Sequence, residues 1–171
     1  GVILEGAVAG DWSGRSVGSA GDVNGDGFSD LLIGARYASP AGRAEAGETY
    51  LIYGRSNGLP ALITLTNSWL DGTNGVILAG AAAGIWSGGS VSSAGDVNGD
   101  GLADMLVGAL QADPSGRADA GETYLIYGRS NGLPALVTLT NSWLDGTNGV
   151  LLAGAVSNDY SGRWVSSAGD V

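Results

Sequence analysis

The sequence predicts an all-β protein assembled from repeated units of four short strands. Three observations support this prediction. Copies of one acidic loop begin at Asp22, Asp96 and Asp170, so the chain repeats with a period of 74 residues. Glycine supplies 32 of the 171 residues, which is typical of many tight turns between short strands. No segment shows a sustained helical period of apolar residues with capping residues at its ends. The chain therefore contains two units and a fraction of a third.

Four strands are expected in the first unit, and the second repeats them. Residues 16–23 form a small-residue strand that enters the acidic loop, and residues 30–35 leave it as an almost wholly apolar strand. Residues 48–54, rich in aromatic and branched side chains, form the third strand, and residues 76–79 form the fourth. Residues 61–67 alternate Leu, Thr and Ile. For them an edge strand, a short helical turn and an extended cover over the sheet all stay open.

A unit of this size with four consecutive strands matches one blade of a β-propeller. A calcium β-roll is the alternative for repeated Asp-Gly motifs, but it needs a much shorter repeat, of about nine residues. We therefore predict β-propeller blades of four antiparallel strands in an incomplete propeller of two blades plus flanking strands. The predicted divisions are an outer strand of a preceding blade (1–14), two blades (15–88 and 89–162) and the first strand of a further blade (163–171).

The acidic loop has the pattern of a calcium site. Oxygen-bearing side chains occupy its first, third, fifth and ninth positions, and the glycines between them let a short chain turn around one cation. The backbone carbonyl at the seventh position supplies a further oxygen. We expect about one Ca²⁺ per complete repeat. The predicted ligands are Asp22, Asn24, Asp26, Phe28 and Asp30 in the first loop and Asp96, Asn98, Asp100, Leu102 and Asp104 in the second.

Other interpretations of the loop are weaker. An EF-hand places a bidentate Glu at position twelve, whereas this chain has Ile33 and Val107 there. Magnesium prefers strict octahedral geometry and retained water. A turn rich in Asp and Asn that holds no ion is the remaining alternative. The third copy, which begins at Asp170, indicates that the chain continues or is completed by a neighbour.

Composition excludes several classes of function. The chain has 17 acidic residues and seven basic ones, all Arg, for a formal charge of −10, which argues against a nucleic-acid partner. No apolar run is long enough for membrane insertion. Without His, Lys or Cys the usual bases and nucleophiles are missing, and the obvious carboxylates are assigned to calcium. We therefore expect a protein that is not an enzyme.

Two further sets of side chains recur at fixed repeat positions. Trp12, Trp86 and Tyr160 share one position, where packing between blades is favoured over a platform for stacking a ligand. Arg15 and Arg163 flank the small-residue strand and are candidates for pairing with acids across blades, although isolated surface pairs contribute little stability.

Residues 90–109, Ser-Val-Ser-Ser-Ala-Gly-Asp-Val-Asn-Gly-Asp-Gly-Leu-Ala-Asp-Met-Leu-Val-Gly-Ala, resemble the FG-GAP repeat. This repeat builds the seven-bladed propeller of integrin α chains and of many bacterial surface proteins. The resemblance covers the whole chain, with two departures. Ser-Gly stands where the family has Phe-Gly, and Arg36 or Leu110 follows Gly-Ala where the family has Pro. The resemblance implies FG-GAP blades with the calcium loop on the hairpin between the first and second strands.

The resemblance also implies an extracellular or cell-surface role in adhesion or scaffolding. We expect a calcium-binding structural or adhesive repeat protein in which calcium rigidifies each blade. Its expected partners are copies of itself or further repeats of the same chain, which would add head to tail into an array or filament because every junction is alike. The alternative is a ligand-binding propeller module of an adhesin, which would recognise a protein or glycan through loops such as residues 38–47.

Overall fold

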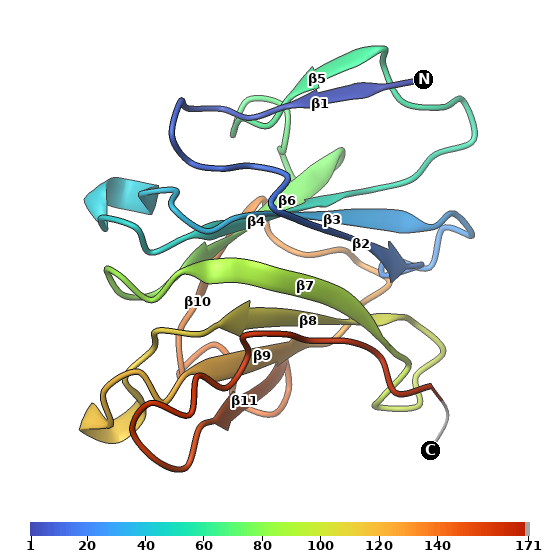
Figure 1. Ribbon diagram of the computed structural model, residues 1–171. Coiled ribbons are helices and arrows are strands. Elements are labelled where there is room, and N and C mark those ends of the chain that lie inside the picture. The colour runs from blue at the N-terminus through green and yellow to red at the C-terminus, as the bar shows by residue number, and fades with distance from the viewer. Residues whose placement is uncertain (170–171) are drawn as a thin grey trace.

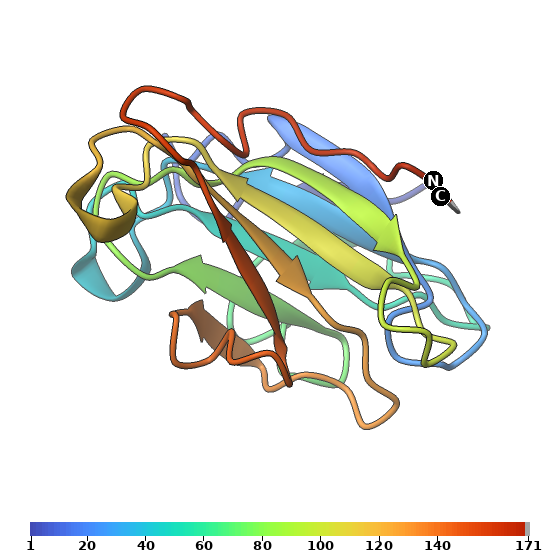
Figure 2. The same ribbon diagram turned by 90° about the horizontal axis from the view of Figure 1, so that it is seen from below.

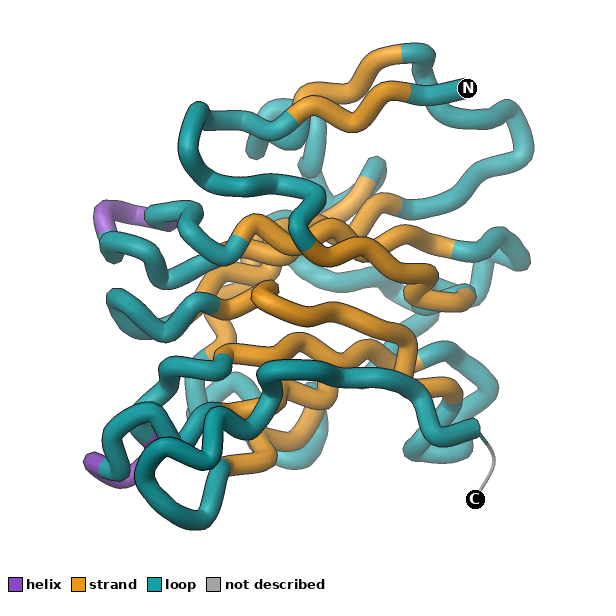
Figure 3. The backbone as a smooth tube through the Cα atoms, viewed as in Figure 1, coloured by secondary structure: helices purple, strands orange, loops and turns teal. Residues whose placement is uncertain are grey.

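The computed structural model describes residues 1–169, so the third acidic loop at Asp170 lies outside the described residues. The strands form sheets of two, five and four strands (Figure 1). The prediction of an all-β chain of propeller blades is confirmed, and the blades form an incomplete propeller that does not close. Short 3₁₀ turns lie in equivalent loops, η1 at Pro40–Gly42 and η2 at Pro114–Gly116 (Figure 3). No helix within residues 1–169 has the length and apolar character needed to cross a membrane.

Each repeat contributes four antiparallel strands in chain order. The first blade contains β2 (Ser16–Gly21), β3 (Asp30–Ala35), β4 (Glu48–Ile52) and β6 (Gly75–Gly80). The second contains β7 (Ser87–Gly95), β8 (Asp104–Ala109), β9 (Glu122–Ile126) and β11 (Gly149–Ala153). These bounds lie close to the strands that the sequence predicts.

The segment that the sequence left open is an edge strand with an unexpected partner. Residues Leu62–Thr64 form β5, which pairs in parallel with β1 (Ile3–Glu5). The equivalent β10 (Leu136–Leu139) pairs in parallel with β6 of the preceding repeat. Each repeat thus adds a strand to the outer edge of the blade before it, which covers backbone groups that an edge strand would leave unpaired.

Residues 163–169, placed by the sequence in a first strand of a further blade, hold no assigned strand. They continue from the end of the second blade as the irregular red segment of Figure 1. The backbone N–H of Val165 donates a hydrogen bond to Ser90 Oγ at 3.0 Å.

The larger of two buried clusters lies between the blades. It joins Leu32 and Leu51 of the first blade to Val91, Met105 and other apolar residues of the second. In Figure 2 the two larger sheets are layered one on the other, as this shared core requires. The smaller cluster lies on the opposite face of the first blade, under β1, β5 and residues 65–70. The larger core is therefore shared between neighbouring blades.

Candidate functional site

The two predicted calcium loops lie on the hairpins β2–β3 and β7–β8, with the same internal hydrogen bonds. Asp22 Oδ1 accepts hydrogen bonds from the N–H groups of Gly25 at 2.7 Å and Asp26 at 3.1 Å, and Asp22 Oδ2 accepts one from Gly27 at 2.9 Å. The same contacts in the second loop measure 2.8, 3.1 and 2.8 Å around Asp96. The first ligand position therefore organises the turn through three backbone amides.

The third and fifth positions also contact each other. Asn24 Nδ2 donates to Asp26 Oδ2 at 3.0 Å, and Asp26 Oδ1 accepts the N–H of Phe28 at 2.9 Å. Asn98, Asp100 and Leu102 repeat both contacts at 2.9 Å. The structure therefore brings the side chains at positions three and five into contact, while the position-one carboxylate binds backbone amides of the same tight loop in each repeat.

The ninth position has a role that sequence reasoning missed. Asp30 is fully buried at the start of β3, where Oδ2 accepts the N–H of Val23 at 2.9 Å and Oδ1 accepts the N–H of Gly54 at 2.8 Å. This carboxylate ties the start of its loop to the chain that follows β4. Its counterpart Asp104 bonds Val97 and Gly128 in the same way, at 2.8 and 2.9 Å. An Asp at the head of an apolar strand is the sequence signal for such a brace.

Burial raises the pKa of the Asp30 carboxyl to about 6. The amides of Gly54 and Val23 act in the opposite direction, while the negative charges of Asp26 and Asp22 add to the rise. Burial likewise raises the pKa of Asp104. The ionised form of each ninth-position carboxyl is therefore costly in the folded chain unless positive charge is supplied nearby.

The chemistry of the donors fits calcium. Carboxylate and amide oxygens are hard ligands, and an oxygen that accepts one N–H keeps a further lone pair. Within residues 1–169, however, no group of three or more Asp, Glu, His or Cys side chains lies close enough together to hold a metal. In the structure these oxygens bind backbone amides, and Asp30 and Asp104 lie beneath their loops.

The surroundings of the two loops differ. The carbonyl of Asp22 accepts the N–H of Ala103 at 2.9 Å, and that of Val23 accepts the N–H of Arg129 at 2.9 Å. The first loop is therefore held against the second blade. The equivalent residues of the second loop, Asp96 and Val97, are exposed.

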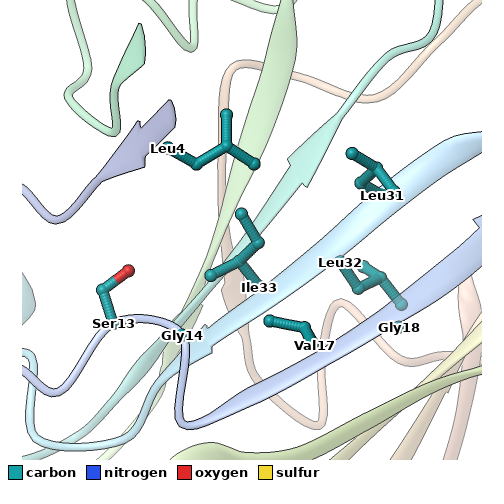
Figure 4. A pocket seen from close by; sticks show the side chains of 8 residues that line it. All are labelled: Leu4, Ser13, Gly14, Val17, Gly18, Leu31, Leu32 and Ile33. Atoms are coloured by element: carbon teal, nitrogen blue, oxygen red, sulfur yellow. The ribbon is translucent and has the colours of Figure 1, made fainter. Parts of the chain in front are cut away.

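A second feature is the partly uncovered outer face of the first blade. A cavity of about 390 Å³ lies between β1 and the inner strands β2 and β3. Figure 4 shows Leu4, Val17, Leu31 and Ile33 gathered around it. Val17 and Leu31 are exposed, whereas the equivalent Val91 and Met105 are buried against the first blade. This apolar surface is thus the same side of the blade that forms an interface in the second repeat.

Comparison with known proteins agrees with this geometry. The FG-GAP repeat model matches residues 13–52 and 87–126, the segments that hold the first three strands and the acidic loop of each blade. The chain carries FG-GAP repeats. Both matches begin at the Ser-Gly pair and extend through the third strand.

Relatives of this chain include integrin α chains and a phospholipase. Mouse integrin alpha-IIb is 35% identical over 167 residues, which cover 93% of this chain and 15% of the integrin. Integrin alpha pat-2 of Caenorhabditis elegans is 34% identical over 110 residues, 62% of this chain and 8% of that protein. Mouse phosphatidylinositol-glycan-specific phospholipase D is 34% identical over 114 residues, 67% of this chain and 13% of the phospholipase. The chain thus spans only a small part of each relative.

One of the two FG-GAP departures, the Ser-Gly pair, lies at the contact between blades. A Cβ on Gly34 would collide with the carbonyl oxygen of Gly88, and one on Gly47 with the backbone of Ser87. The N–H of Ser87 donates to the carbonyl of Ala46 at 3.0 Å. The Ser-Gly pair of one FG-GAP repeat therefore inserts against the Gly-Ala of the repeat before it, where only glycine leaves room.

Proposed function

We propose that this chain is part of an extracellular, non-enzymatic repeat protein with a structural or adhesive role, in which calcium rigidifies each blade. The observation that carries the proposal is the acidic loop, which folds with the same hydrogen bonds in both repeats. Its position on the hairpin between the two inner strands suits an ion that stiffens the blade. The integrin relatives support adhesion as the wider role.

Calcium would be held by the side chains of positions one, three, five and nine and by the carbonyl at position seven. In the first loop these are Asp22, Asn24, Asp26, Phe28 and Asp30, and in the second Asp96, Asn98, Asp100, Leu102 and Asp104. The ion would supply positive charge to three carboxylates that otherwise repel one another across a short turn. An affinity on the order of 0.1–1 mM suffices for a structural site outside the cell.

Thermal unfolding with and without calcium tests this proposal. Calcium should raise the unfolding temperature, and EDTA should reverse the rise, because an ion that binds only the folded state stabilises it. The double variant Asp22→Ala/Asp96→Ala should lose the calcium response. Magnesium at the same concentration should have a smaller effect.

A matched control comes from another pair of repeated acids. Asp71 and Asp145 are exposed, accept two backbone amides each and lie outside the acidic loops. The variant Asp71→Ala/Asp145→Ala removes the same charge and should keep the full calcium response. No stabilisation of the wild type by calcium, or equal loss in both double variants, would reject the calcium site.

We further propose that the uncovered blade faces bind other blades of the same repeat, from the same chain or another copy, in a head-to-tail array. The internal interface buries Val91 and Met105 of the second blade against Leu32 and Leu78 of the first. In the first blade, the residues equivalent to Val91 and Met105 are Val17 and Leu31, and both are exposed. In the second blade, the residues equivalent to Leu32 and Leu78 are Leu106, which is partly exposed, and Leu152, which is exposed. The two free faces therefore match the two sides of an interface that the chain already forms.

A further inference from the structure

Four of the seven arginines make hydrogen bonds that recur in both repeats. Arg43 and Arg117 donate through Nε to the carbonyls of Gly80 and Gly154 at 3.0 and 3.1 Å, and Arg55 and Arg129 donate to Asn74 and Asn148 at 2.8 and 2.7 Å. Each pair makes the same bond in both repeats. The remaining three, Arg15, Arg36 and Arg163, line one pocket of about 250 Å³.

The lining of this pocket comes from four repeat positions that vary. Trp86 and Tyr160 occupy the first of these positions. Arg15, Gly89 and Arg163 occupy the second, and Arg36 and Leu110 occupy the third. At the fourth, Trp164 replaces the Ser16 and Ser90 of the earlier copies. Gly89 leaves space where the other two copies carry Arg. The pocket is therefore specific to this junction of three successive repeats.

The Arg36 guanidinium is fixed by aromatic rings. Its Cζ lies 5.2, 4.7 and 5.2 Å from the ring centroids of Trp12, Tyr37 and Trp86. One terminal nitrogen donates to Tyr37 Oη at 3.0 Å, and the buried Nε has no hydrogen-bond partner within residues 1–169. A guanidinium held in this way keeps donors available and loses little freedom when a ligand binds.

Two acidic residues near these rings line a different pocket. Trp86 Nε1 donates to Glu45 Oε2 at 3.0 Å, and Glu45 lines a separate pocket with Asp11 and Tyr37. Among residues 1–169, no acidic side chain lines the arginine pocket. Three like charges therefore face one small space in a protein whose formal charge is −10, and an anion in that space would relieve their repulsion.

We propose that this pocket binds a carboxylate-bearing sugar ring of the uronic-acid class. Arginine forks pair with a carboxylate in bidentate geometry, and the rings of Trp86, Tyr160 and Trp164 offer apolar surface to the body of the sugar. The volume is below the roughly 300–1,000 Å³ of pockets for drug-sized ligands, so it suits one ring. The pocket is formed within this chain, so it depends neither on the calcium loops nor on association with another copy.

Titration with defined probes tests the assignment. Trp86 and Trp164 line the pocket, so tryptophan fluorescence reports its occupancy. D-Glucuronate should bind saturably, and its affinity should fall as the salt concentration rises. D-Glucose, which lacks the carboxylate, and sulfate, which lacks the sugar ring, should each bind at least about tenfold more weakly. Equal binding of sulfate, or tighter binding of N-acetyl-aspartate amide, would overturn the sugar assignment.

The repeat supplies variants whose residues it already accepts. Arg36→Leu introduces the residue of the second repeat, and Gly89→Arg introduces the residue of the first and third; each should lower glucuronate affinity at least about tenfold. The control Val137→Ile copies Ile63 at a buried position that does not line the pocket and should bind like the wild type. Unfolding curves of all three establish that they fold. Folded Arg36→Leu or Gly89→Arg protein with unchanged affinity would refute the site.

Discussion

The two repeats have nearly the same sequence but different surroundings. Val17 is 67% exposed and Leu31 is 39% exposed in the first blade, whereas Val91 and Met105 at the same positions are 7% and 0% exposed in the second. The repeat is the same, so the difference comes from the neighbouring blade that covers the second. Burial at these positions is therefore determined by contact with a neighbouring blade rather than by the repeat alone.

Contacts within a blade show the opposite behaviour. The Asp30 brace and the Asp104 brace have the same partners at nearly the same distances, although the outer loop surfaces differ. Each repeat thus determines its own hairpin and acidic loop, and the neighbour determines the burial of the face between the blades. Paired substitutions at equivalent positions separate these two contributions.

The largest difference is expected between Met105→Ala and Leu31→Ala. Met105 is fully buried between the blades, so its truncation should cost about 2–5 kcal/mol of unfolding free energy. Leu31→Ala should cost about 1 kcal/mol or less at low protein concentration, because that surface has no blade over it. Urea unfolding measures both, and similar costs would contradict the assignment of burial to the neighbour.

Glycine substitutions at the blade contact should show a smaller difference. Gly34→Ala places a Cβ against the Gly88 carbonyl between two complete blades. It should lower the free energy of unfolding by at least about 1–3 kcal/mol. Gly108→Ala meets the equivalent Gly162 carbonyl, but only the irregular residues 160–169 need to shift there. Its cost should be lower in the same urea experiment. The reverse order would show that the second contact is the tighter one.

The brace substitutions should cost the same in both repeats. Asp30→Ala and Asp104→Ala each remove the acceptor of two backbone amides, and each should cost about 1–3 kcal/mol without calcium. Differential scanning calorimetry in EDTA compares them directly. A large difference between the two would mean that the brace depends on the neighbouring blade.

The smallest effects are expected at Leu62 and Leu136, which are exposed in both repeats. Leu62→Ser and Leu136→Ser should each change the unfolding free energy by about 0.5 kcal/mol or less, since neither removes a buried contact. Parallel urea titrations provide the measurement. A cost above 1.5 kcal/mol at either position would show that the face beside β5 or β10 is covered in solution.

The sequence predicted what each repeat encodes locally. Apolar runs such as 30–35 and the turn chemistry of the acidic loop depend on neighbours in the chain, and both lie where they were expected. The partner of residues 61–67 was beyond such reasoning, because β5 and β10 pair with the preceding repeat rather than with their own. No local sequence pattern shows whether such a strand joins the edge of its own blade or the edge of the preceding one.

The acidic loop could likewise be predicted only in part. The spacing identified Asp22, Asn24 and Asp26 as one loop, but it did not show that Asp30 lies beneath that loop with both oxygens on backbone amides. The cluster around Arg36 was also missed, since its members come from three repeats and meet only when the blades pack.

Sedimentation velocity of the 171-residue chain tests most directly whether the free faces bind other blades. In calcium, the sedimentation coefficient of the wild type should rise with protein concentration, while Val17→Asp should remain monomeric and folded because the charge lies on an exposed face. Leu62→Ser, exposed beside β1, serves as a control and should associate like the wild type. A wild type that stays monomeric at every concentration, or a Val17→Asp variant that associates equally, would contradict head-to-tail addition of blades.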